Sequence, residues 1–201
     1  MRSSLIILLF FVAGVLAGTS GILPVALTQT GLSTWALYVL MLLVGISIGA
    51  DSRVLEAIRS HGYRLLLIPL ITITGTFAGV LPLALLLRDY GWVEVLAVGA
   101  GFGYYSLSSI IIGELHSEAL GVVALLANIM REILTLLLAP AMVVWFGKLA
   151  PVVSGGATSM DTTLPIITTA SGKEFAIVAL FHGMALTILV PILVTFILSL
   201  G

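Results

Sequence analysis

No charged side chain occurs between Ser3 and Ala50. A transmembrane helix needs about 20 predominantly apolar residues, since each residue rises about 1.5 Å across a hydrocarbon core about 30 Å thick. The uncharged run is long enough for two such helices, which we predict at residues 5–26 and 33–49. A patch rich in threonine and glycine at residues 28–31 marks the turn between them.

The composition of the whole chain is that of a membrane protein. Of its 201 residues, 60% are hydrophobic and 8% are charged, whereas a soluble domain carries about 25% charged residues. These proportions exclude a soluble enzyme, a nucleic-acid-binding module and a disordered chain, and they make the lipid bilayer the solvent for most of the surface. The chain contains no cysteine, which excludes disulfides and thiolate metal sites.

Further apolar segments follow the first two, and we predict them at residues 65–87, 92–113, 119–146, 148–170 and 174–200. The predicted fold class is an all-α polytopic membrane protein with about seven transmembrane elements. We interpret residues 1–201 as a single transmembrane transporter domain. Within it, residues 1–87 are predicted to form plain membrane-spanning helices, and residues 92–201 a transport core whose helices are interrupted.

Lysine and arginine predict the orientation, because they are enriched in cytoplasmic loops. With the N-terminus inside the cell, the seven-element arrangement places more of these residues in the cytoplasm than on the other side. The cytoplasmic ones are Arg2, Arg53, Arg59, Arg64 and Lys173, and the others are Arg88 and Lys148. We therefore predict a multi-pass protein of the plasma membrane whose N-terminus and loop 51–64 are cytoplasmic.

The first unusual apolar segment contains three alternating glycines at residues 99–103, followed by two tyrosines and three serines up to residue 109. Glycine weakens a helix and permits unusual backbone angles. One interpretation is close helix packing through small residues. The other is a helix interrupted near the middle of the membrane, where backbone groups and the side chains of Tyr105 and Ser106 meet a ligand.

A polar stripe occurs in the segment 119–146. Asn128 and Glu132 are four residues apart and share one helix face, and Arg131 borders that face. Arg131 has a structural interpretation, an ion pair with an acid elsewhere in the fold. Glu132 is not neutralised by Arg131, because adjacent helix residues point about 100° apart, and so it is predicted to meet a substrate cation or a proton.

The third unusual place is the polar run at residues 154–165. Gly155 and Gly156 favour an unwound backbone, and Thr158 followed by Asp161 resembles a helix N-cap. We predict an unwound segment followed by a half-helix that starts near Thr158 and attracts an anion or carboxylate. Ser159 is a further candidate ligand. A polar loop outside the membrane is the alternative interpretation.

His182 is the remaining candidate. It lies in the last apolar segment, where it serves either as a hydrogen-bonded structural residue or as a proton relay. The sequence contains no metal-binding spacing and no nucleophile-elbow motif, so no cofactor and no metal site are predicted.

Together, membrane acids, glycine-rich breaks and a free helix end are components of a secondary transporter. A carboxyl group in a site of low dielectric exchanges protons near neutral pH, and when ionised it holds a cation. A cationic amino acid suits such a site, but an inorganic cation exchanged for protons suits it as well. The alternative of another class is an intramembrane enzyme or a receptor-like membrane protein.

The three polar runs also resemble those of the L-lysine exporter family LysO. The matching motifs are residues 101–108, Asn128-x-x-Arg-Glu132 and residues 155–165, with residues 182–193 in support. The resemblance implies export of lysine and of analogues such as thialysine in exchange for protons. It also implies kinship with the cation–proton antiporter and bile-acid transporter superfamily, whose interrupted helices cross. The family's membrane acids would fall on Glu132 and Asp161.

This resemblance covers the chain from about residue 40 to its end. Longer members of the family carry additional N-terminal membrane segments. We therefore expect either that the seven elements suffice, or that a homodimer partner or a small companion membrane protein supplies the missing helices.

Overall fold

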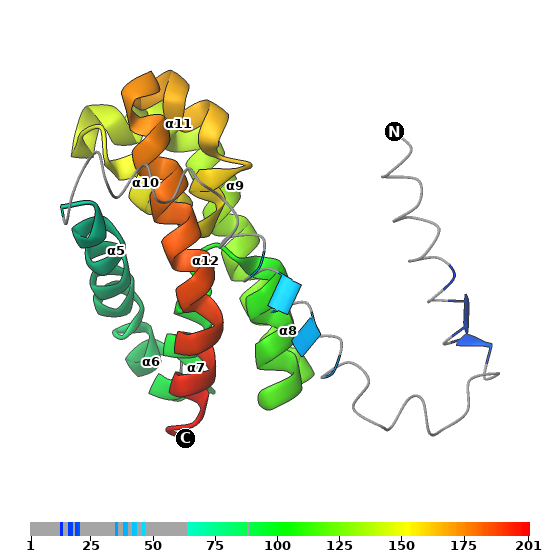
Figure 1. The fold of residues 1–201 in the computed structure, drawn as a ribbon. Coiled ribbons are helices and arrows are strands. Elements are labelled where there is room, and N and C mark those ends of the chain that lie inside the picture. The colour runs from blue at the N-terminus through cyan, green and yellow to red at the C-terminus, as the bar shows by residue number, and fades with distance from the viewer. Residues whose placement is uncertain are drawn as a thin grey trace. The chain divides into compact units, whose positions relative to one another are not determined.

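The computed structural model describes residues 64–87 and 89–201, together with isolated helical positions between residues 13 and 46. The chain divides into two compact units, Met1–Leu43 and Val44–Gly201. The helices predicted at residues 5–26 and 33–49, and nearly all of the loop 51–64, lie outside the described residues. The architecture below is that of the second unit (Figure 1).

Within the described residues the regular structure is entirely helical, which confirms the predicted all-α class. The elements are α5 (Arg64–Val80), α6 (Leu83–Leu86), α7 (Trp92–Gly99), α8 (Tyr105–Leu115), α9 (Glu118–Phe146), α10 (Ala150–Gly155), the 3-10 helix η1 (Gly156–Met160), α11 (Leu164–Ser171), the 3-10 helix η2 (Lys173–Phe175) and α12 (Ala176–Leu198).

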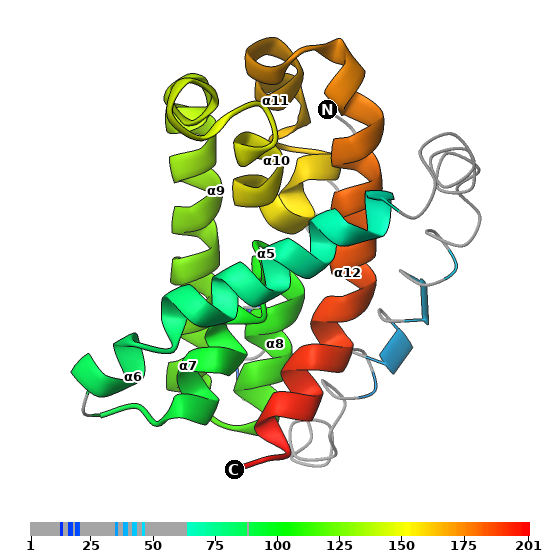
Figure 2. The same ribbon diagram turned by 90° about the vertical axis from the view of Figure 1, so that its left-hand side faces the viewer.

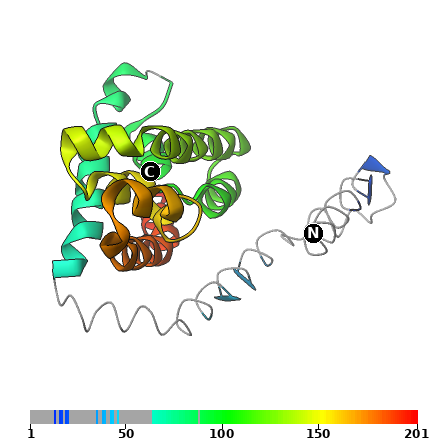
Figure 3. The same ribbon diagram turned by 90° about the horizontal axis from the view of Figure 1, so that it is seen from above.

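Three segments of the described chain are long and apolar enough to cross a membrane: Leu65–Leu86, Glu118–Phe146 and Lys173–Leu198. They correspond to three of the predicted spans. The last is the central one, because half of its most apolar window is buried inside the protein, against 17% and 22% for the other two. Figure 3 shows α5 along one side of the group formed by the remaining helices.

The segment predicted to cross at residues 92–113 folds back instead. The helices α7 and α8 are separated by a turn at residues 100–104, where Phe102 and Gly103 have positive φ angles of 42° and 90°. Glu94, near the start of α7, and His116, just after α8, lie 3.4 Å apart. Both ends of the segment are therefore at the same end of the bundle, and α7 and α8 form a hairpin with its tip at residues 100–104 (Figure 2).

The segment predicted to cross at residues 148–170 also folds back. Lys148, before α10, and Glu174, after α11, lie 3.2 Å apart, so this second hairpin enters and leaves at one end, with η1 at its tip. The half-helix predicted to start near Thr158 begins at Leu164 instead. The Thr158 hydroxyl donates to the Gly155 carbonyl at 2.8 Å and caps no helix.

The two hairpins enter from opposite ends of the bundle, and their tips touch. The backbone N–H of Ala157 in η1 donates to the carbonyl of Phe102 at 2.8 Å. The two predicted interruptions are thus confirmed. The short helices on either side of each interruption form a hairpin, however, and do not continue across the bundle. The crossed arrangement implied by the resemblance is not found in the described part of the chain.

Gly156 is required where the tips meet. Its φ is +63°, and a Cβ atom there would collide with the Phe102 carbonyl oxygen. We expect Gly156→Ala to lower the free energy of unfolding by about 1–3 kcal/mol or more, because strained backbone and the steric conflict add. Thermal unfolding of the purified protein in detergent measures this.

Gly75→Ala is the matched control. Gly75 lies within α5, and nothing lies within 4 Å of a Cβ atom built there. Alanine should be neutral or stabilise α5 by up to about 1 kcal/mol. Equal losses in the two variants would contradict the role given to Gly156.

Candidate functional site

Asn128 holds the tip of the first hairpin. Its side chain is 4% exposed on α9. Its Oδ1 accepts a hydrogen bond from the Gly103 N–H at 2.7 Å, while its Nδ2 donates to the carbonyls of Ala124 at 2.9 Å and Val98 at 3.3 Å. The amide therefore bonds to backbone on both sides of the turn, which satisfies groups that the break in the helix leaves without helical partners.

Arg131, almost one turn further along α9, holds the second hairpin. Its Nε donates to the Ser154 carbonyl at 2.8 Å and its Nη2 to the Val153 carbonyl at 3.0 Å. These carbonyls lie at the C-terminal end of α10, where the helix dipole is negative and favours a cation. No ion pair joins Arg131 to an acid within the described residues, so backbone carbonyls take the place of the acid expected from the sequence.

Thr135 continues this polar face of α9. Its hydroxyl lies 2.7 Å from that of Ser154 and bonds to the Arg131 carbonyl at 2.9 Å. The face thus contacts both hairpins, through Asn128 on one and through Arg131 and Thr135 on the other. The polar side chains that stand out in the sequence of this helix therefore hold the two hairpins through hydrogen bonds.

Glu132 has no such role. Glu132 is half-buried near the middle of α9, and no hydrogen bond or ion pair reaches its carboxyl group from the described part of the chain. A charge at membrane depth is costly unless it is paired or faces water. The carboxyl group of Glu132 therefore takes no part in holding the hairpin tips in the described part of the chain.

His182 links α12, α5 and the second hairpin tip. It is fully buried, with Nε2 at 2.8 Å from the Thr72 hydroxyl and Nδ1 at 3.2 Å from the Ser159 hydroxyl. The Ser159 hydroxyl also lies within hydrogen-bonding distance of the Gly156 and Ala179 carbonyls. Since a carbonyl only accepts, Ser159 donates to one of them, and the Thr72 hydroxyl likewise donates to the Ile68 carbonyl at 3.0 Å. Each ring nitrogen of His182 therefore faces a hydroxyl oxygen that has a carbonyl acceptor of its own.

Asp161 lies just beyond the second tip and is exposed. Its Oδ1 accepts from the Thr162 backbone N–H at 2.6 Å, with the Thr162 hydroxyl at 3.4 Å. No hydrogen bond from the described residues reaches Oδ2. Among the described residues, Asp161 contributes the only carboxylate or basic side chain to a cavity of about 110 Å³ lined by Gly103, Tyr104, Tyr105, Ser106, Ala157, Thr158, Met160, Asp161, Thr162 and Thr187.

This cavity, which we call the Asp161 cavity, unites four of the residues predicted from the sequence: Tyr105, Ser106, Thr158 and Asp161. The helix that begins at the cavity is α8, at Tyr105, and not a half-helix at Thr158. Among the described residues, the sequence analysis missed Thr187 here and Thr72 beside His182. A threonine in an apolar helix carries little signal, because its hydroxyl ordinarily bonds to its own helix.

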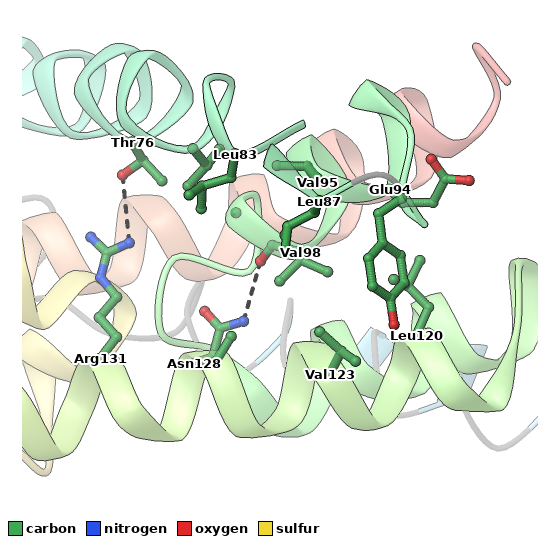
Figure 4. A pocket seen from close by; sticks show the side chains of 14 residues that line it. Thr76, Leu83, Leu87, Glu94, Val95, Val98, Leu120, Val123, Asn128 and Arg131 are labelled. Carbon is green, nitrogen blue, oxygen red and sulfur yellow. Dashed lines mark hydrogen bonds between the residues drawn. The ribbon is translucent and has the colours of Figure 1, made fainter. Parts of the chain in front are cut away.

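Two larger cavities meet at Arg131. One, of about 290 Å³, lies between α5, α6, α7 and α9 and is mainly apolar, with Asn128 and Arg131 toward one end and Glu94 toward the other (Figure 4). The other, of about 380 Å³, is lined by residues that include Thr72, Thr76, Arg131 and Ser154. Thr76 lines both, 3.5 Å from the guanidinium Nη1. No group of three His, Asp or Glu side chains suited to a metal occurs in the described residues.

Comparison with known proteins gives consistent matches. The family model described as "Lysine exporter LysO" matches residues 8–198, which is more of the chain than the motifs quoted above. The Escherichia coli (strain K12) protein named "Lysine exporter LysO" is 31% identical over 185 residues, and the chain spans 60% of the length of that relative. A Haemophilus influenzae (strain ATCC 51907 / DSM 11121 / KW20 / Rd) protein named "Putative lysine exporter" is 30% identical over 166 residues, covering 83% of this chain and 84% of that protein. No solved structure matches significantly.

Proposed function

The chain belongs to the lysine exporter LysO family, and on that premise we propose that it is a secondary active transporter that exports L-lysine, and analogues such as thialysine, from the cell. Export is coupled to the entry of protons. The observation that carries the proposal is the position of Asp161. Its carboxylate lines a cavity beside the two hairpin tips, and these tips come from opposite ends of the bundle and are in contact.

Asp161 is assigned to the ammonium group of the substrate. It is exposed in the Asp161 cavity, and one of its oxygens is committed to Thr162. A cation entering this cavity therefore meets the remaining oxygen, and a charge-assisted hydrogen bond to a carboxylate is among the stronger interactions available there. Tyr105, Ser106 and Thr158 line the same cavity and complete its walls.

Glu132 is assigned to the coupled proton. Its carboxyl group has no partner among the described residues and lies in a helix long enough to span the membrane. Since no ion pair or hydrogen bond from the described residues holds this carboxyl group, a proton can bind and leave it without breaking such a contact. Asn128, Arg131, Gly155, Gly156, Ser159 and His182 are assigned to holding the hairpin tips on which both steps depend.

The test is a flux measurement with purified protein in liposomes. Vesicles loaded with radiolabelled lysine should release it when a pH gradient is imposed, and lysine movement should in turn carry protons. Proton flux that follows an inorganic cation and ignores lysine would favour the inorganic cation–proton antiporter instead, and lysine release driven by a sodium gradient at equal pH would contradict coupling to protons.

The orientation proposal gains support from the fold. The sequence analysis placed Lys148 and Lys173 on opposite sides, but the second hairpin places Lys148 beside Glu174, the neighbour of Lys173. The proposed orientation puts the end of the bundle with Lys148 and Lys173 in the cytoplasm, along with the loop 51–64. Among the connecting segments, Arg88 is then the only lysine or arginine assigned to the outside, so the excess of basic residues on the cytoplasmic side becomes larger.

The absence of native cysteine makes this orientation directly testable. We expect Ala119→Cys, at the opposite end from Lys148, to react with an impermeant reagent added to intact cells. Lys148→Cys and Ser60→Cys should react only after permeabilisation. Labelling of Ser60→Cys from outside would invert the proposed orientation. Labelling of Lys148→Cys but not Ser60→Cys from outside would contradict the hairpin, and labelling of Ala119→Cys and Lys148→Cys from the same side would contradict a membrane-crossing α9.

A further inference from the structure

We propose that the Asp161 cavity binds the amino-acid head group of the substrate, and that the hydroxyl of Thr187 is a specificity-determining contact to that head group. The inference rests on the proposed function, since it concerns how the exported amino acid is recognised. It adds a residue from α12 and a site for the substrate carboxylate to the assignment of Asp161.

The hydroxyl of Thr187 is buried and unpaired within the described part of the chain. The residue is 2% exposed, and its Oγ1 has no hydrogen-bond partner among the described residues. Five other threonines in described helices bond to the carbonyl four residues before them: Thr72, Thr74, Thr135, Thr168 and Thr169. A buried hydroxyl left unpaired is unfavourable, and Thr187 lines the cavity in which a ligand would supply the missing bond.

The beginning of α8 supplies the opposite polarity. Its first residues, Tyr105 and Ser106, line the cavity, and Tyr104 makes no side-chain cap. The first N–H groups of a helix have no acceptor within it. They form a favourable site for a carboxylate, because the helix dipole is positive there. The hydrogen bond that closes the first turn of α8 is donated by the Ser108 N–H to the Tyr104 carbonyl at 3.1 Å.

An amino-acid head group matches these features together. Its carboxylate meets the N–H groups at the start of α8, and its ammonium meets Asp161. An ammonium group has three N–H donors, and one carboxylate oxygen of Asp161 does not accept from all of them. Thr187 Oγ1 is therefore assigned as a second acceptor for this ammonium group. The cavity volume of about 110 Å³ suits a head group, and the lysine side chain then leaves through the mouth where Asp161 is exposed.

Thr187→Val tests the inference, because valine keeps the shape and removes only the hydroxyl. We expect lysine affinity, measured by calorimetry on the purified protein, to fall about tenfold or more, as for a lost hydrogen bond to a charged group. The affinity for Nε-acetyl-lysine, which keeps the head group, should fall by the same factor. Competition by 6-aminohexanoate, which keeps the carboxylate and lacks the α-ammonium, should stay within about twofold of its value in the parent.

Stability separates this role from a structural one. Since Thr187 Oγ1 has no partner to lose, Thr187→Val should unfold at the same temperature as the parent or higher. Thr187→Ser, which keeps the hydroxyl, should retain lysine affinity. Ser171→Ala is the matched control, because Ser171 Oγ is also buried without a partner but does not line this cavity; it should leave affinity unchanged.

Unchanged lysine affinity in a folded Thr187→Val protein would overturn the inference, as would an equal loss for 6-aminohexanoate or a clear loss of stability. A parent protein that binds no lysine would instead refute the proposed function. The parent measurement, made first, therefore distinguishes the two failures.

Discussion

Replacing Asp161 by Asn is expected to lower lysine affinity by about 10–100-fold, the loss typical of a hydrogen bond to a charged group. The fold should survive, because Asn keeps an oxygen that accepts from the Thr162 N–H. Calorimetry on the purified protein gives the affinity without requiring flux, and thermal unfolding gives the stability.

Asp89→Asn is the control for this experiment. Asp89 is also exposed, but it lies in the turn before α7 and does not line the Asp161 cavity. Its neutralisation tests whether the loss of any negative charge weakens the binding of a cation. Equal affinities in the parent and in Asp161→Asn would show that the substrate ammonium does not bind at this carboxylate.

Replacing Glu132 by Gln is expected to abolish lysine flux driven by a pH gradient, while exchange of internal for external lysine persists. Gln resembles the protonated acid and cannot release a proton. Because no hydrogen bond or ion pair from the described residues reaches Glu132, the substitution strands no partner and should leave the unfolding temperature nearly unchanged. Flux into liposomes, measured with and without a pH gradient, separates the two activities.

Glu118→Gln provides the comparison on the same helix, since Glu118 is exposed in the first turn of α9. Its flux should match that of the parent. Parental pH-driven export by a folded Glu132→Gln protein would exclude this acid as the coupling site. A large loss of stability would show instead that Glu132 has a structural partner.

The interruptions of the fold were predictable, and the path of the chain through them was not. Alternating glycines at residues 99–103 and the pair Gly155–Gly156 weaken a helix wherever it lies, and both breaks are present. An apolar run of about 20 residues has the same composition whether it crosses the membrane or folds back halfway. What distinguishes the two is long-range pairing, Glu94 with His116 and Lys148 with Glu174.

The site shows the same division. A stripe with Asn128 and Arg131 is conspicuous in an apolar helix, and both residues are where the hairpin tips meet α9. Their partners are backbone carbonyls and a backbone N–H, which have no signature in the residue types. Thr187 was missed for the opposite reason, because threonine is common in helices and only the structure shows that its hydroxyl lacks the usual partner.

The opposed hairpins have a consequence for how the core is organised. Each is followed by a long helix, α9 after the first and α12 after the second, and each long helix bonds to the tip of the hairpin before it, through Asn128 to Gly103 and through His182 to Ser159. The two hairpin–helix units therefore have the same order of elements and run through the bundle in opposite directions, the arrangement expected of an inverted-topology repeat. In such a repeat, exchanging the conformations of the halves converts a state open to one side into a state open to the other.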